Sequence, residues 1–245
     1  MPSISIKPEV IFRIFNFPVT NSLLSSEIVL LVFFVMAVAY NSQAGKINKS
    51  GFFYFFNAFV KMLYDLFYTV TKEKTRYFFA LFFTFFVFII MQNWFGLLPL
   101  VGSLLVRVKE GGETVAIPLF RGGDADLNTT FAFAIISVVM VQYFGVKFVG
   151  LKKYLSKFFN FANPINFFAG LLEIEGEISH ILSFAFRLFG NIFAGEVLLT
   201  IISFLVPVLA SFPFVVMEFF FGFIQALIFS MLTAVFIGGA IEAHH

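Results

Sequence analysis

The sequence SFAFRLFGNIFAGE, residues 183–196, lies within a long apolar segment and contains a fixed positive charge. Between residues 178 and 210, only Arg187 and Glu196 carry a fixed charge. An apolar segment of this length is typical of a helix in a lipid bilayer. An arginine at membrane depth costs at least about 2.5–3.5 kcal/mol and cannot escape by losing its proton. We therefore predict a membrane helix in which Arg187 has a function.

Two simpler roles for Arg187 are that it reaches a lipid headgroup or that it joins two helices. Its neighbours favour a functional role, because Ser183 and Asn191 stand four residues before and after it on the same helix face. The arginine also lies near the middle of the predicted span, away from the headgroups at either end.

Composition assigns the whole chain to the membrane. Of its 245 residues, 60% are hydrophobic and 12% are charged, which predicts a single integral membrane domain over residues 1–245. The net charge of +2 is small and scattered, so we expect no nucleic-acid partner. The chain has no cysteine and three histidines, two of them at its end, so we expect neither a metal site nor a cofactor.

Hydropathy along the chain predicts an all-α membrane protein with about five membrane helices and one interfacial amphipathic helix. The predicted membrane helices cover residues 28–40 (with apolar residues from 23 onward), 77–100, 127–149, 163–206 and 214–244. Residues 1–27 are expected to form an exposed lead, and residues 101–126 an outer loop with a short hairpin within 104–120.

Residues 52–70 predict the interfacial helix. Asn57, Lys61, Asp65 and Thr69 recur every four residues in this otherwise apolar segment and so form a narrow polar stripe. Such a helix lies along the membrane surface with its stripe toward water.

The distribution of basic residues predicts the orientation. Lysines and arginines are concentrated in residues 41–76 and 147–157, whereas residues 101–126 carry fewer basic than acidic side chains. The positive-inside rule places the two basic loops in the cytoplasm, so the N-terminus lies outside and the C-terminus in the cytoplasm.

The last two predicted helices are too long to stand upright in a bilayer. Residues 163–206 would extend about 66 Å at ~1.5 Å per residue, whereas the hydrocarbon core is ~30 Å thick. Residues 214–244 also exceed one upright span. A tilted antiparallel pair, joined near residues 207–213, explains both lengths.

This antiparallel pair predicts how its polar residues meet. Pairing Arg187 with Gln225 places Glu196 near Glu218. Glu196 comes nine residues after Arg187, so it faces about half a revolution away from Arg187 around the helix. Two carboxylates at low dielectric do not both ionise easily, so such a pair suits a proton relay. The alternatives are that both acids are neutralised by other subunits and that Gln225 only hydrogen-bonds between helices.

A further polar track leads toward Arg187 on the same helix face. It consists of Glu173, Glu177, His180 and, beyond Arg187, Asn191. The acidic residues of this track could also be simply solvated or favour the helix dipole.

Three blocks of the sequence resemble subunit a of the F-type ATP synthase, the membrane stator that conducts ions to the rotor ring. They are RLFGN followed by AGE (residues 187–191 and 194–196), EFFFGFIQA (218–226) and ADLNTT (125–130). The blocks occur in the family's order and spread over more than half of the chain, which makes the resemblance specific.

The resemblance implies a mechanism and a set of partners. Protons would enter an outer half-channel containing Glu196 and Glu218, protonate a rotor carboxylate, and leave through a second half-channel toward the cytoplasm, with Arg187 between the two. The chain would be no enzyme on its own, but a channel subunit in contact with the rotor ring, the peripheral-stalk b subunits and lipid, in a bacterial inner membrane. The residues assigned to translocation are Arg187, Glu196, Glu218, Gln225 and Asn191, with Glu173, Glu177, His180, Asp126 and Asn128 as further channel-lining candidates.

Two departures from the family pattern leave details open. Ile181 stands where many members have a proline, and both Glu196 and Glu218 are glutamates where several members have one histidine. The order of proton transfer therefore stays open. The choice of H⁺ or Na⁺ stays open as well, because the rotor carboxylate and its ligands lie on another chain. A secondary transporter or channel with a buried Arg–Glu site is the alternative function, and a structural scaffold is a third.

Overall fold

The computed structural model describes residues 7–15, 17–46, 50–98, 101–110, 113–158, 164–205 and 211–242. Within these ranges, five helical segments are long and apolar enough to cross a membrane, which confirms the prediction of an all-α membrane protein. Their helices are α1 (Asn21–Ala44), α2 and α3 (Gly51–Thr71 and Thr75–Gly96, one continuous segment), α4 (Leu127–Val149), α6 (Pro164–Leu205) and α7 (Ser211–Glu242).

Short elements connect the long helices. They are the hairpins β1–β2 (Val10–Ile14, Phe17–Thr20) and β3–β4 (Leu105–Glu110, Glu113–Pro118), the 3-10 turns η1 (Lys72–Lys74) and η2 (Gly123–Ala125), and helix α5 (Leu151–Phe158). The hairpin predicted within residues 104–120 is confirmed by β3–β4. Helix α5 was not predicted, although its apolar residues repeat at helical spacing. Tyr154 is the buried residue of this helix.

The predicted lead of residues 1–27 is wrong in its extent. Helix α1 begins at Asn21, directly after β2, because the Thr20 hydroxyl accepts a hydrogen bond from the backbone N–H of Leu23 at 3.2 Å. The first turns of α1 are polar, which hid them from hydropathy, but Ser22 and Ser25 are buried against neighbouring segments.

The other predicted bounds lie close to the observed ones. The range 127–149 matches α4, and α3 ends at Gly96, before the predicted 100. Helix α7 begins three residues before the predicted 214, since Pro213 in its first turn needs no helical hydrogen bond. Residues 163 and 206–210, and the last residues after 242, lie outside the described ranges.

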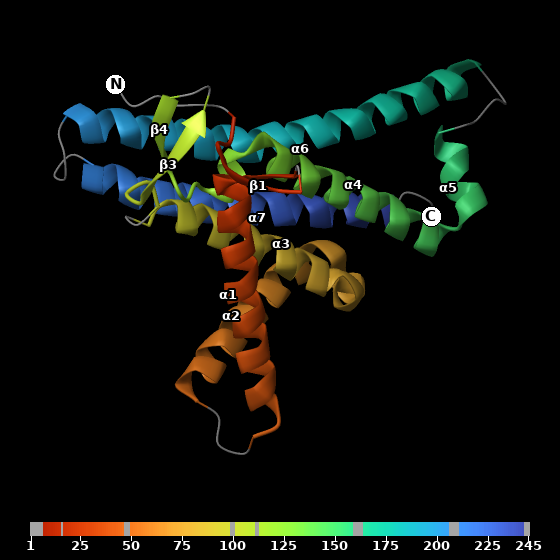
Figure 1. Ribbon diagram of the computed structural model, residues 1–245. Helices are drawn as coiled ribbons and strands as arrows, with labels where there is room; N and C mark the ends of the chain where they lie inside the picture. Colours follow the sequence, from red (N-terminus) through yellow and green to blue (C-terminus); the bar gives the residue numbers. More distant parts are fainter. Residues whose placement is uncertain are drawn as a thin grey trace.

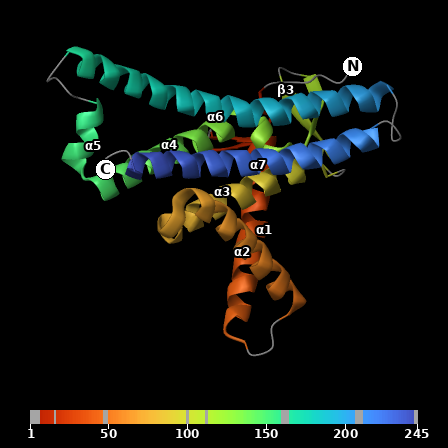
Figure 2. The same ribbon diagram turned by 180° about the vertical axis from the view of Figure 1, so that it is seen from behind.

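Four helices form a layer that α1 crosses steeply. Helices α3, α4, α6 and α7 run side by side in Figure 1, and α1 leaves this layer with α2 beside it. Seen from behind, α6 and α7 lie along each other over most of their length (Figure 2). Helix α6 has 42 residues, or about 63 Å at ~1.5 Å per residue. If α1 stands upright in the bilayer, α6 and α7 are therefore strongly tilted, as their length requires.

Contacts between α6 and α7 confirm the predicted antiparallel register. The rings of Phe184 and Phe229 are 5.0 Å apart, and the hydroxyls of Ser203 and Ser211 are 3.0 Å apart. This register places Gln225 about level with Arg187. It also places Glu218 beside Gly195, the neighbour of Glu196.

The core between these helices is largely aromatic. Its fully buried side chains include Phe78, Phe82, Phe86 and Phe229. By contrast, the outer face of α1 exposes Leu31, Phe34 and Val38, a surface that lipid covers in a membrane. On α2 the four residues of the predicted polar stripe are all exposed while Leu63 and Phe67 are buried, which confirms the stripe; its place at the interface stays a prediction.

Candidate functional site

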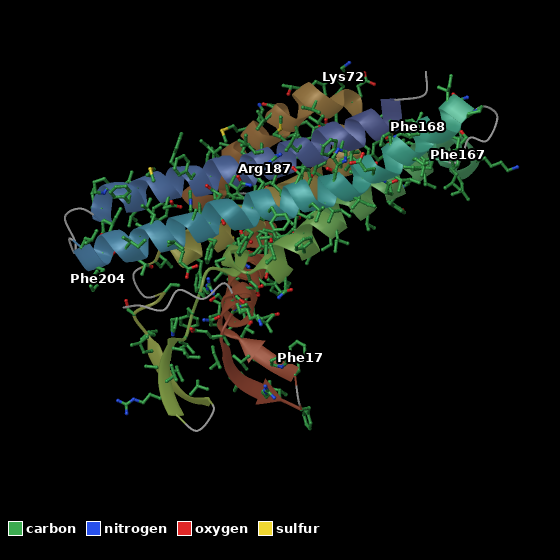
Figure 3. All side chains as sticks on the ribbon, turned by 90° about the horizontal axis from the view of Figure 1, so that it is seen from above. Phe17, Lys72, Phe167, Phe168, Arg187 and Phe204 are labelled. Carbon is green, nitrogen blue, oxygen red and sulfur yellow. The ribbon has the colours of Figure 1, made fainter. Side chains whose placement is uncertain are left out.

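Arg187 lies about half-way along α6 and points to the outside of the chain (Figure 3). Its Nη2 donates a hydrogen bond to the Ser183 hydroxyl at 3.2 Å. Within the described part of the chain, no carboxylate lies within ion-pair distance of its guanidinium. The inward face of this turn carries Ala185 and Leu188, both fully buried. The charge of Arg187 therefore faces the outside of the chain.

Small side chains surround Arg187 on the exposed face of α6. We call Ser179, Ser183, Gly190 and Ala194 the small-residue strip, since all four are exposed and, with Arg187 between Ser183 and Gly190, they recur every three or four residues along one helix face. A Cβ atom added at Gly190 would meet nothing within 4 Å. A helix of another protein can approach α6 closely along this strip.

Two amides lie near the level of Arg187. Asn191 is half-buried on the next turn of α6, as predicted from its spacing. Gln225 on α7 is only 6% exposed, and its Nε2 has no hydrogen-bond partner among the described residues. A buried amide without a partner is costly, so this nitrogen is suited to a group that arrives from elsewhere.

A cavity of about 500 Å³ opens between α6, α7, the end of α3 and the segment that follows it. We call it the outer cavity, because it adjoins residues 101–126, which are predicted to lie outside. Its polar lining comprises Asn93, Ser103, Arg121, Glu196, Thr200, Ser203 and Glu218. The structure thus brings Glu196 and Glu218 to one site, as the register predicted.

Glu196 pairs with an arginine instead of with Glu218. Arg121, which precedes η2, donates from Nη2 and Nε to one oxygen of Glu196, at 3.1 and 3.2 Å. The sequence analysis missed this pair, although Arg121 is the basic residue nearest to the ADLNTT block. Its partner could not be identified without knowing that residues 75 positions apart meet.

Glu218 is buried on the other side of the outer cavity. It is 5% exposed and lies against Gly195 so closely that a Cβ there would overlap its carboxylate. The turn of α7 that carries it is held to α3, because Asn93 Nδ2 donates to the Gly222 carbonyl at 3.1 Å and Trp94 Nε1 to the Phe219 carbonyl at 3.1 Å. These bonds fix the position of Glu218 relative to the cavity.

A second cavity of about 250 Å³ lies near the other end of α6. We call it the inner cavity, because Lys157 in its wall belongs to the basic segment predicted to be cytoplasmic. The predicted residues Glu173, Glu177 and His180 all line it. Lys157 forms an ion pair with Glu173, and the His180 ring stacks on Phe236 with centroids 4.1 Å apart.

Helix α5 closes the inner cavity from the side. Tyr154 donates a hydrogen bond to Gln142 of α4 at 2.7 Å, and its ring lies against Gly145, where a Cβ would overlap it. Burial, followed by the charges of Glu177 and Glu173, raises the pKa of Tyr154 to about 12. Tyr154 therefore keeps its proton and acts as a fixed donor between α4 and α5.

Two of the predicted channel-lining residues lie outside both cavities. Asp126 caps α4, since one of its oxygens accepts from the Asn128 N–H at 2.9 Å and the other from the Ser22 hydroxyl at 2.8 Å. Asn128 is exposed on the first turn of that helix. Asp126 thus has a structural role, because one of its oxygens caps α4 and the other holds the start of α4 to α1.

Asp124 is an acidic residue that the sequence analysis missed. Its side chain is fully buried in η2, and neither oxygen has a hydrogen-bond partner among the described residues. Burial raises the pKa of the Asp124 carboxyl well above its usual range. Polar groups lie nearby, because a Cβ at the adjacent Gly123 would overlap Gln92 and Ser26. Across the described ranges, no three His, Cys, Asp or Glu side chains come together as a metal site would require.

Comparisons with known proteins identify a single family. A family model described as ATP synthase A chain matches residues 23–238, a range that includes Arg187, the outer cavity and most of the inner-cavity lining. The ATP synthase subunit a of Syntrophobacter fumaroxidans is 35% identical over 195 residues, covering 78% of this chain and 72% of that protein. The protein of the same name in Legionella pneumophila is 28% identical over 237 residues, covering 95% and 91%. That of Campylobacter jejuni is 39% identical over 146 residues, covering 58% and 63%.

Proposed function

Because the chain belongs to the ATP synthase subunit a family, we propose that it conducts protons across the membrane as a stator subunit and catalyses no reaction itself. The observation that carries the proposal is the exposed charge of Arg187, half-way along α6 and between two separate cavities. Arg187 belongs to the lining of neither cavity, which supports a role between two separate paths.

The two cavities serve as two half-channels in this proposal. A proton enters the outer cavity from the side of residues 101–126 and reaches the acidic residues there. It then passes to a carboxylate on a rotor subunit, and a rotor carboxyl arriving on the other side of Arg187 releases its proton into the inner cavity. Glu173, Glu177 and His180 offer acceptors along that second path.

Arg187 keeps the two paths apart. Its guanidinium stays charged at ordinary pH, so it carries no proton between the cavities. As a cation, it favours the ionised form of a rotor carboxylate that comes close. Each charge that crosses the membrane is worth ~2.3 kcal/mol per 100 mV, and a leak past Arg187 would dissipate this energy without rotation.

The rotor ring is the proposed partner at the small-residue strip. The strip leaves room for a helix to pass close to Arg187, and larger apolar residues such as Leu182 and Phe186 flank it. We further propose contacts with peripheral-stalk b subunits, a bacterial inner membrane as the location, and an N-terminus outside and C-terminus in the cytoplasm. The basic segments at 41–76 and 147–157 support that orientation.

ATP-driven proton pumping in vesicles that contain the assembled complex tests the proposal. Arg187→Ala is expected to abolish pumping while the complex still assembles. Arg107→Ala is the matched control, because Arg107 is exposed on the outer hairpin and should leave pumping unchanged. If Arg187→Ala pumps as the wild type does, the arginine is structural and the proposal is wrong. Copurification of a ring of small subunits separates a stator from an independent transporter.

A further inference from the structure

We propose that Arg121 is a positioning residue that holds Glu196 as a paired carboxylate, which leaves Glu218 as the group that carries protons through the outer cavity. The inference rests on the proposed function and deepens it. It resolves which of the two carboxylates exchanges protons, a question that their spacing in the sequence leaves open.

The ion pair between Arg121 and Glu196 is built into the fold. The Arg121 side chain is 7% exposed, so its charge has little access to water. Besides its two bonds to Glu196, it donates from Nη1 to the Lys7 carbonyl at 3.3 Å, and its backbone N–H donates to the Ser25 hydroxyl at 3.2 Å. Protonation of Glu196 would remove the negative charge that balances Arg121. Because these hydrogen bonds hold the guanidinium in place, it would then stay buried and unpaired, which is costly, so Glu196 stays ionised.

Glu218, unlike Glu196, has no charged partner in the part of the chain that the structure describes. Within the described residues it has neither a hydrogen bond nor an ion pair, and it is 5% exposed at the edge of the outer cavity. The charged groups that line this cavity with it are Glu196 from α6 and Arg121 from the segment before η2, and these two already neutralise each other. The wall from α3 contributes the uncharged Asn93.

The proton balance then involves one carboxylate. A proton from water in the outer cavity binds the Glu218 carboxylate and forms its O–H bond. That bond breaks when the proton passes to the rotor carboxylate, and Glu218 returns to its ionised form. Glu196 keeps its charge throughout and balances Arg121, so that the arginine does not hold Glu218 in the ionised form.

Pumping by a set of neutral variants tests the inference. Glu196→Gln leaves the buried Arg121 charge without its partner, and Arg121→Gln leaves the partly exposed Glu196 carboxylate without one. Each should lower pumping about tenfold or more. The double variant removes both charges and should pump clearly better than either single variant, because the two residues act as a pair. Glu218→Gln should abolish pumping. If the double variant pumps no better than Glu196→Gln, Glu196 carries protons and the inference is wrong.

Two controls separate this inference from the proposed function and from faulty assembly. Arg187→Ala in the same vesicles tests the stator mechanism. If this variant does not pump and the double variant pumps no better than Glu196→Gln, the proposed function stands and only the role of Arg121 is refuted. Infrared difference spectra of the complex, recorded while pH is changed, give a readout that does not need pumping. A signal from a carboxyl C=O should disappear in Glu218→Gln and persist in Glu196→Gln; the reverse result refutes the inference.

Discussion

Gly195 of α6 lies directly against the carboxylate of Glu218 of α7, with no space for a methyl group between them. Gly195→Ala should therefore displace the flexible end of Glu218 and leave the helices in place. A displacement of about 1 Å can cost about 10²-fold in a proton-transfer step that depends on geometry. Pumping should fall strongly in assembled complexes. Gly176→Ala on the same helix meets nothing within 4 Å and should pump normally; equal pumping by both variants would contradict the assignment of Glu218.

The small-residue strip predicts that a large side chain at Gly190 prevents a partner helix from approaching α6 without disturbing the fold of the chain itself. A side chain at Gly190 has open space within this chain, so Gly190→Leu should fold normally. If a rotor helix passes close to Arg187, the same variant should lose most of its pumping. Ala37→Leu on the exposed face of α1 is the control of similar added volume. Normal pumping by Gly190→Leu would show that the rotor does not approach along this strip.

The two cavities should open to opposite sides of the membrane. The chain has no cysteine, so a single introduced thiol is a specific probe. Ser203→Cys lines the outer cavity and Gly239→Cys the inner one. Silver ions, which are small and bind thiolate, should inhibit pumping by Ser203→Cys only from the side of residues 101–126 and by Gly239→Cys only from the other side. Inhibition of both variants from one side would argue against two half-channels.

Asp124 predicts a dependence of stability on pH. Burial raises the pKa of its carboxyl in the folded chain well above the ordinary 3.8, so unfolding releases a proton at pH values between 3.8 and the folded-state pKa. Its contribution to stability is therefore complete at low pH and is lost as pH rises toward the folded-state pKa. Asp124→Asn removes the ionisable group and with it this loss of stability at higher pH. The variant should therefore have a higher melting temperature at pH 7, by about 2–4 °C for each kcal/mol gained in the free energy of unfolding.

The same gain should shrink as the pH falls toward 3.8, where the wild-type carboxyl is protonated in both states. Thermal unfolding of the purified chain in detergent, followed at several pH values, measures the difference. Asp65→Asn, at an exposed site on α2, should show no such trend. An Asp124→Asn variant that is less stable at pH 7 and more stable at low pH would show that Asp124 is ionised in the fold.

Local sequence patterns were sufficient to predict most of the helices. The range of α4 and the antiparallel register of α6 and α7 follow from apolar length and from helical spacing, which are properties of neighbouring residues. The resemblance to the ATP synthase family, carried by RLFGN and two further blocks, is confirmed by the family match. The start of α1 was missed, because its first turns are polar and their partners lie in other segments.

The sequence by itself determined that this protein is a bundle of membrane helices with one arginine at mid-span, because charge and hydropathy act through the local cost of burial in lipid. Only the tertiary structure decided what each acidic residue does. Glu196 pairs with Arg121, Asp126 caps a helix, and Glu218 is buried beside Gly195 without a cationic partner among the residues that the structure describes. These roles depend on contacts between residues far apart in the chain, so no periodicity in the sequence contains them.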